Sequence, residues 1–307
     1  MAVNYGLGGF KNGAAYVSAS NASSGSIDTN VQDEFFPINL EMNAQSNLNI
    51  TIEETYKFQV NLQGIYYIKY SITSSGANGD DFTAGISINE SAAESFGRTM
   101  FNSKQADEYT SNSSTILQIQ GNTNITFLIA NNSASPDPIT IEKFNVAIIR
   151  IGDLATQSEN FLSGNSCLSL QYSGTDAFSY TEKDIFFKID YTLTKGIGQQ
   201  IESPDNNIKI IQDGFYLIDW SLSTSGSSND NFTLGLMKNG ETDSDVLSYP
   251  QQRFNIKGGS LFQTGFQGLL QLKENDTIAF AIANNTDTTG TTKFRQNNIV
   301  IIRLGNI

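Results

Sequence analysis

The chain of 307 residues carries 18 basic and 31 acidic residues, a formal net charge of −13 and no histidine. Nucleic acids and anionic membranes are bound through clustered Lys and Arg, so neither is an expected partner. Without histidine no Ser-His-Asp or Cys-His arrangement can form, and the acidic residues show no pair placed for glycoside hydrolysis, so we expect no enzyme.

The chain begins with a glycine-rich arm, residues 1–13, in which Val3, Tyr5 and Leu7 alternate with polar residues or glycine. This is the period of a strand, but glycine makes such a strand unstable alone. An extended arm can add to a sheet edge of another subunit, so we expect these three residues to serve assembly; a disordered terminus is the alternative. We find neither a signal peptide nor a run of transmembrane length.

Short apolar strands separated by polar turns follow, with no amphipathic helix of about ten residues or more. Strands at spacings of roughly 8–12 residues are typical of an all-β sandwich. The elements predicted for the first half are Ala14–Ala19, Phe35–Met42, Leu48–Ile52, Tyr56–Leu62, a hairpin over Gly64–Asn89, Phe96–Phe101, Thr115–Ile119, Ile125–Ala130 and Val146–Ile151.

The segment Gly64–Asn89 recurs 150 residues later as Gly214–Asn239, with 11 of 26 positions identical. Matches further along, such as Ile148 with Ile301, lie 153 residues apart, so the two copies differ by three residues in length. Self-similarity of this kind indicates two copies of one structural unit. The predicted organisation is the arm, a first domain over residues 14–153, a linker over 154–165 and a second domain over 166–307.

The strand that follows each repeated glycine is apolar on both faces near its start, so one face needs a cover outside the sandwich core. Tyr66 and Tyr216 lie there, and we expect them to contribute to self-association. Trp220 shares a face with Tyr216 and Ile218, which predicts a packing residue in the core or at a trimer seam and not a sugar platform.

The single cysteine, Cys167, cannot form a disulfide within the chain. A buried apolar thiol on a strand is the expected state, since free cysteines are usually buried. An intermolecular bridge that links subunits is the alternative, which makes Cys167 a candidate assembly residue.

Acidic residues recur at the turn inside each copy, as Asp80 and Asp81 in the first and Asp230 in the second. Carboxylate oxygens are ligands that calcium prefers, so these three residues are candidate metal ligands. Asp and Asn also cap turns with their own side chains, and this is the interpretation that we favour.

The motifs, taken in order, resemble a known family. They are Gly64-Ile-Tyr-Tyr-Ile and Gly214-Phe-Tyr-Leu-Ile, then Leu117-Gln-Ile-Gln-Gly-Asn-Thr-Asn-Ile and Leu270-Gln-Leu-Lys-Glu-Asn-Asp-Thr-Ile, and a closing Ile301-Ile-Arg-Leu. This order resembles the complement-type globular head of the tumour necrosis factor-like jelly rolls, above all the bacterial heads of collagen-like glycoproteins on spore surfaces. The resemblance covers nearly the whole chain, twice.

The resemblance implies two tandem jelly-roll β-sandwiches, trimers, calcium near a trimer apex, and roles in recognition or surface architecture. The chain departs from the family in having no collagen-like Gly-X-Y tract. In place of the family's Gly-Asp before the penultimate strand it has Asn275-Asp276 and Asn122-Thr123.

We therefore expect a self-assembling structural protein, a homotrimer or higher assembly, located outside the cell or on a spore or particle surface. The alternative is a head of an adhesin or phage fibre that binds a receptor or surface glycans, and a viral capsid of paired jelly rolls ranks third. No cofactor is expected apart from calcium. Light scattering, imaging and glycan binding separate these classes, because one fold serves many functions.

Overall fold

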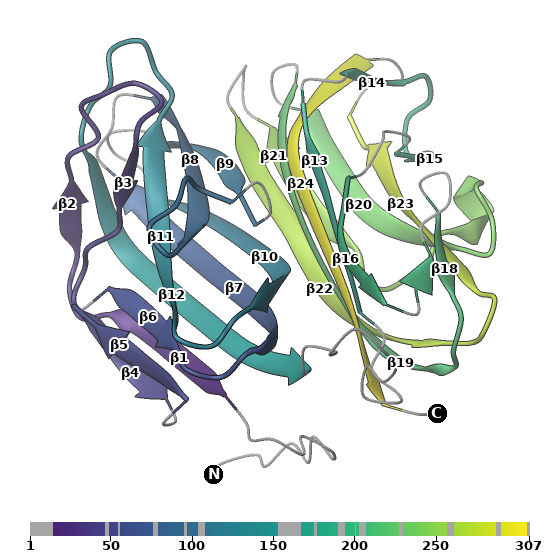
Figure 1. Cartoon of the computed structure of the whole chain (residues 1–307). Helices are drawn as coiled ribbons and strands as arrows, with labels where there is room; N and C mark the ends of the chain where they lie inside the picture. The colour runs from purple at the N-terminus through teal and green to yellow at the C-terminus, as the bar shows by residue number, and fades with distance from the viewer. Residues whose placement is uncertain are drawn as a thin grey trace.

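Two β-sandwiches, one from each half of the chain, lie side by side in the computed structural model (Figure 1). The described residues are 15–46, 49–54, 56–75, 79–94, 97–103, 108–152, 167–174, 177–189, 194–199, 201–202, 207–226, 230–256, 261–286 and 290–305. The predicted arm and linker, with Val3, Tyr5 and Leu7, lie outside these ranges.

The first sandwich consists of two antiparallel sheets with the strand orders β10-β7-β12-β1-β4 and β5-β6-β11-β8-β9; β2 pairs with β12 and β3 with β11. The strands are β1 (Tyr16–Asn21), β2 (Gly25–Ile27), β3 (Phe35–Pro37), β4 (Met42–Ser46), β5 (Ile50–Glu53), β6 (Lys57–Val60), β7 (Gly64–Ser75), β8 (Asp80–Ile88), β9 (Thr99–Ser103), β10 (Tyr109–Ile119), β11 (Thr123–Asn131) and β12 (Ile139–Gly152).

The second sandwich repeats this arrangement, with the orders β16-β13-β24-β19-β22 and β17-β18-β23-β20-β21; β14 pairs with β24 and β15 with β23. The strands are β13 (Cys167–Ser173), β14 (Ala177–Tyr180), β15 (Phe186–Lys188), β16 (Thr194–Gln199), β17 (Ile201–Glu202), β18 (Ile208–Ile210), β19 (Gly214–Gly226), β20 (Asp230–Lys238), β21 (Gln252–Ile256), β22 (Phe262–Leu272), β23 (Thr277–Asn284) and β24 (Gly290–Gly305). The all-β class with two jelly-roll sandwiches is thereby confirmed.

The predicted hairpin over Gly64–Asn89 is wrong. β7 pairs with β10 and β12, whereas β8 pairs with β9 and β11 in the facing sheet, so the repeated segment crosses from one sheet to the other. The predicted strand Phe35–Met42 is likewise divided between β3 and β4, which belong to different sheets. Alternation along one strand reports which side chains are buried but not which strand lies beside it.

The repeated glycine that begins β7 and β19 is required by a close approach of the chain. A Cβ atom on Gly64 would lie 2.5 Å from Arg150 Nε and 2.6 Å from the carbonyl oxygen of Gly152. In the second sandwich, a Cβ atom on Gly214 would lie 2.5 Å from the carbonyl oxygen of Gly305. A side chain there would displace the backbone of the last strand, so both copies need glycine.

Aromatic side chains from both sheets fill the two cores. In the second sandwich Trp220 is fully buried, 5.2 Å from Phe266 and 4.6 Å from Phe280 between ring centroids. In the first, Phe127 contacts Tyr70, which occupies the same place in the repeat as Trp220. The prediction that Trp220 is a packing residue is confirmed. Among the described residues, no helix has the length and apolar character needed to span a bilayer.

Candidate functional site: the interface between the two sandwiches

The two sandwiches meet through unlike surfaces. The first sandwich contributes its edge, where β9 and β10 end the two sheets, together with the outward side chains of the adjacent β7. The second contributes the outward face of the sheet that contains β13, β24, β19 and β22. We call the first the edge surface (Ile65, Tyr67, Lys69, Met100, Ser113, Ile116) and the second the face surface (Cys167, Ser169, Asp219, Ser223, Asn298, Val300, Ile302).

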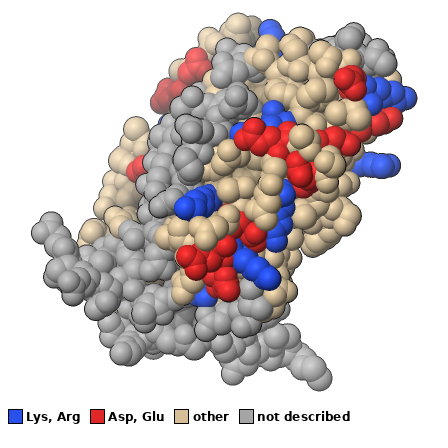
Figure 2. Space-filling view, turned by 90° about the vertical axis from the view of Figure 1, so that its right-hand side faces the viewer, with Lys and Arg blue, Asp and Glu red and all other residues tan. Residues whose placement is uncertain are grey.

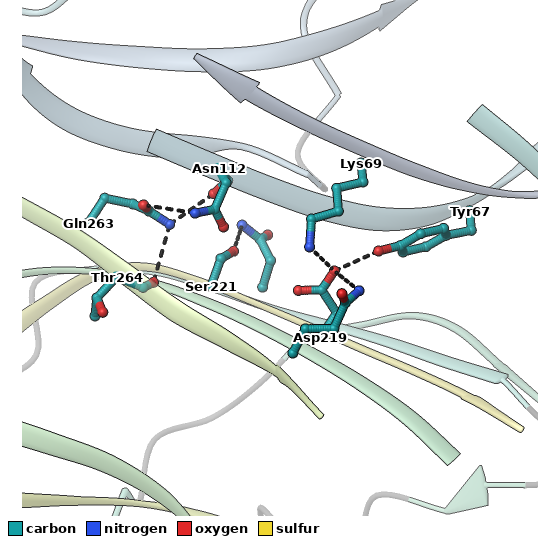
Figure 3. A network of polar contacts seen from close by, with 9 residues as sticks. Tyr67, Lys69, Asn112, Asp219, Ser221, Gln263 and Thr264 are labelled. Atoms are coloured by element: carbon teal, nitrogen blue, oxygen red, sulfur yellow. Dashed lines mark hydrogen bonds and ion pairs between the residues drawn. The ribbon is translucent and has the colours of Figure 1, made fainter. Parts of the chain in front are cut away.

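A buried carboxylate stands at the centre of this interface (Figure 3). The Tyr67 hydroxyl donates to Asp219 Oδ2 at 2.6 Å, and Lys69 Nζ lies 2.8 Å from the same oxygen. Gln267 Nε2 donates to it from β22 at 3.4 Å. Asp219 is only 2 % exposed, so these donors replace the water that a carboxylate needs. Burial, and then the charge of Asp219, raise the pKa of the Tyr67 hydroxyl.

Main-chain groups of the edge surface are bonded by side chains of the face surface. Ser223 Oγ donates to the Met100 carbonyl at 2.7 Å and accepts from the Met100 amide at 3.2 Å. Asn298 Nδ2 donates to the Arg98 carbonyl and, at 3.1 Å, to Ser113 Oγ. An exposed sheet edge is a surface that other strands can join, and here the second sandwich covers it.

An apolar cluster lies beside the polar centre. Ile65, Tyr67 and Ile116 of the first sandwich pack against three residues of the second, Cys167, Val300 and Ile302. Burial raises the pKa of the Cys167 thiol to about 11, and the residue is 4 % exposed. The expected buried thiol is confirmed. Covered in this way, Cys167 contributes packing within the chain, and a bridge to another subunit would require the cluster to open.

Tyr66 and Tyr216 were expected to contribute to self-association, and the structure corrects this expectation. Both side chains point into the sandwich cores and are fully buried, and each hydroxyl donates at 2.6 Å to a main-chain carbonyl. Because side chains alternate along a strand, the outward residues are their neighbours, Ile65 and Tyr67 in the first copy. We did not identify Lys69 and Asp219 as interface residues from the sequence. They occupy one position of the repeat with opposite charges, and this difference could have indicated an ion pair between the two copies.

The three acidic residues accept hydrogen bonds from other segments of their own sandwiches. Asp80 Oδ2 accepts from Asn131 Nδ2 at 2.7 Å and from the Asp137 amide at 3.0 Å. Asp81 Oδ1 accepts from Asn102 Nδ2 at 3.1 Å, and Asp230, in the other sandwich, accepts from a tyrosine hydroxyl at 3.1 Å. In the described part of the chain, no three carboxylate, thiol or imidazole side chains gather to hold a metal. These contacts join separate segments of each sandwich and are not turn caps, so the turn-capping interpretation is not confirmed, and calcium binding remains a prediction.

No family model matches the sequence. No curated protein matches it either. Murine APRIL is similar in structure at 12 % identity and a TM-score of 0.32, over 45 % of this chain and 98 % of that chain. Eiger TNF from S. frugiperda is similar at 12 % identity and a TM-score of 0.31, over 48 % of this chain and 98 % of the other.

A tandem structure is similar along almost the whole chain. The CBM22-1–CBM22-2 tandem domain of Xyn10C from Paenibacillus barcinonensis shows 9 % identity and a TM-score of 0.25, over 97 % of this chain and 95 % of that chain. These likenesses concern the fold, at a distance, and carry no function. The assignment of two jelly rolls depends on the strand orders of the four sheets.

Alkaline pH should destabilise the protein through its buried tyrosines. Burial raises the pKa of Tyr66 to about 12 and also raises those of Tyr67 and Tyr70. Above about pH 10 an unfolded tyrosine loses its proton while the folded one keeps it, so the unfolded state binds fewer protons. The contribution of these tyrosines to the free energy of unfolding is therefore fully present below about pH 10 and decreases as the pH rises above it.

Urea unfolding followed at several values between about pH 8 and 11 measures this slope. Tyr67→Phe should make the decline shallower, whereas Tyr249→Phe, at a residue that is 60 % exposed, should leave it unchanged. A decline equally steep in all three proteins would contradict the assignment to buried tyrosines.

Proposed function

We propose that this chain is a non-catalytic, self-associating structural protein of a surface layer, of the kind found on bacterial spores. The observation that carries the proposal is the interface itself: one sandwich binds another through an ion pair with a buried carboxylate, main-chain hydrogen bonds and an apolar cluster. A fold that docks on a copy of itself within one chain has the surfaces needed to dock between chains.

The chemistry of the described side chains supports a structural role. The buried carboxylates Asp80, Asp219 and Asp230 all accept hydrogen bonds from amide, hydroxyl or ammonium donors of the protein. General acids and bases are instead placed at a cleft where a substrate can reach them. We therefore assign these carboxylates to packing and orientation.

The surface charge of the second sandwich does not favour nucleic acids as partners. Among the described residues on the face of the second sandwich that Figure 2 shows, basic side chains are interleaved with acidic ones and form no continuous basic patch. Pairs such as Lys188 with Glu241 at 2.5 Å and Lys238 with Asp276 at 2.8 Å neutralise one another on this sandwich. Binding to nucleic acids depends on unpaired clusters of Lys and Arg.

Self-association should be visible in purified protein at micromolar concentration. Three chains together would carry a charge of 3 × −13 = −39, so association should strengthen when salt screens the repulsion. Light scattering across a salt series measures the mass, and negative-stain images distinguish filaments from discrete particles. If sodium chloride and calcium chloride strengthen association equally at matched ionic strength, charge screening explains the effect and specific calcium binding is contradicted.

A monomer at all salt concentrations would contradict the proposal. In that case a glycan array decides whether the alternative, a receptor- or glycan-binding head, takes its place. Specific binding by the monomer would support the binding head, and a protein that assembles and binds no glycan would support the structural role.

A further inference from the structure

We propose that two surfaces of the chain still uncovered, the outward face of the first sandwich and the edge of the second, bind each other between two copies of the chain. The contact would repeat the apolar and main-chain parts of the one that joins the two sandwiches internally; its ion pair does not recur, because Lys69 and Asp219 occupy one position of the repeat and pair with each other. This inference rests on the proposed self-association and names the surfaces that carry it.

The internal contact uses each kind of surface once. The first sandwich contributes its edge and keeps its own face surface free, over β1 and β12. The second contributes its face, which includes the part of β22 that contacts β9 and β10, and keeps free its edge at β21 and at the exposed Leu269 of β22. A contact between unlike surfaces does not close on itself and leaves one surface of each kind for a further partner. Rotation between the domains then decides whether copies form a ring or an open series.

The free face of the first sandwich has the chemistry of the covered one. By strand register, Ser18 lies opposite Ala147 in the first sandwich, and Ser169 lies opposite Val300 at the same place in the second. Asn145 of the first sandwich likewise corresponds to Asn298 of the second. Three of these residues, Ser169, Asn298 and Val300, are no more than 3 % exposed because the first sandwich covers them. In the first sandwich Ser18 and Asn145 are exposed. The same small polar side chains therefore stand uncovered.

A hollow on this free face provides room for a partner. Its volume is about 770 Å³, and its floor is formed by residues of β1, β4, β7 and β12. The polar residues that line it include Ser18, Ser20, Asn43, Gln45 and Asn145. Hydroxyl and amide groups such as these bond the main chain of the edge surface in the internal contact, as Ser223 and Asn298 do.

The free edge of the second sandwich is apolar where the covered edge is apolar. In the repeat, Phe215 corresponds to Ile65, and Leu269 corresponds to Ile116. The strand register supports the second match, because Leu269 lies opposite Leu217 just as Ile116 lies opposite Tyr67. Ile65 and Ile116 are at most 1 % exposed, whereas Phe215 is 39 % and Leu269 is 52 % exposed. This apolar edge lacks the cover that the first edge has.

The exposed large apolar side chains gather at these two surfaces. Among the described residues there are six: Tyr16, Val31, Phe215, Tyr249, Leu269 and Leu304. Four of them lie at repeat positions that correspond to residues of the internal apolar cluster or to residues packed against it. Tyr16 corresponds to Cys167, Phe215 to Ile65, Leu269 to Ile116 and Leu304 to Ile151. Exposed apolar side chains concentrated in this way indicate a binding surface, and their correspondence identifies a second copy as the partner.

Three variants of equal net charge test the contact. Leu269→Glu disables the free edge, Ser18→Glu disables the free face, and Val31→Glu, at an exposed residue outside both surfaces, is the control. All three sites are exposed, so circular dichroism melting should show a folded protein in each case. Sedimentation or light scattering then gives the dissociation constant. Leu269→Glu and Ser18→Glu should each raise it at least about tenfold above Val31→Glu, since each buries an unpaired charge.

Mixing completes the test. Each disabled variant retains the surface that the other has lost, so an equal mixture of Leu269→Glu and Ser18→Glu should form a complex that neither forms alone. If the parent associates but both variants associate like the control, or the mixture forms no complex, this contact is overturned while self-association stands. If the parent protein is a monomer throughout, the proposed function itself fails.

Discussion

Replacing Trp220 with alanine should lower the free energy of unfolding by about 3–5 kcal/mol, because a large cavity opens in a packed core. The indole is fully buried between rings of both sheets, and its Nε1 donates to Asn297 Oδ1 at 2.5 Å. Truncation removes that donor as well as the ring contacts. Urea unfolding monitored by circular dichroism measures the change, since the variant lacks the single tryptophan.

Two controls separate packing from a role in binding. Trp220→Tyr introduces the residue that the first sandwich has at the same place, Tyr70, and should be destabilised much less than Trp220→Ala. Tyr249→Ala, at a residue that is 60 % exposed, should change stability by less than about 0.5 kcal/mol. A Trp220→Ala protein that unfolds like the parent but loses binding to a glycan would instead identify Trp220 as a ligand platform.

Replacing Lys69 with methionine should lower the free energy of unfolding by about 3 kcal/mol, because Asp219 then stays buried with its charge uncompensated. The side chain of Asp219 is 3 % exposed and that of Lys69 is 32 % exposed. The pair joins the two sandwiches, so its loss should also weaken their coupling. Calorimetry should then show the thermal transition broadening or dividing in two.

A second substitution identifies the buried charge as the cause. Lys69→Met combined with Asp219→Asn should recover most of the lost stability, since asparagine is neutral and its carbonyl can still accept from Tyr67. Lys188→Met breaks a pair whose partner, Glu241, is 58 % exposed, and should change stability little. If Lys69→Met proves as harmless as Lys188→Met, the pair has no such role in the interface.

The sequence alone determined the architecture of each half. Two segments with the same alternation and the same glycine, 150 residues apart, could only be two copies of one sandwich, and the strand orders agree. Asn239, in the Asn-Gly pair after β20, has a φ of 59°, the positive value for which Asn is suited at turns. These features are local, because side-chain period and backbone conformation are properties of short segments.

Only the tertiary structure decided which surfaces meet. β7 is apolar on both faces, so its sequence could not tell that Tyr66 is in the core while Tyr67 reaches across to Asp219. Alternation is equally compatible with a hairpin and with a crossing between sheets, and β7 and β8 take the crossing. The ion pair between Lys69 and Asp219 joins residues 150 positions apart. Its formation depends on how two folded domains dock, which is a property of their complementary surfaces and not of any one segment.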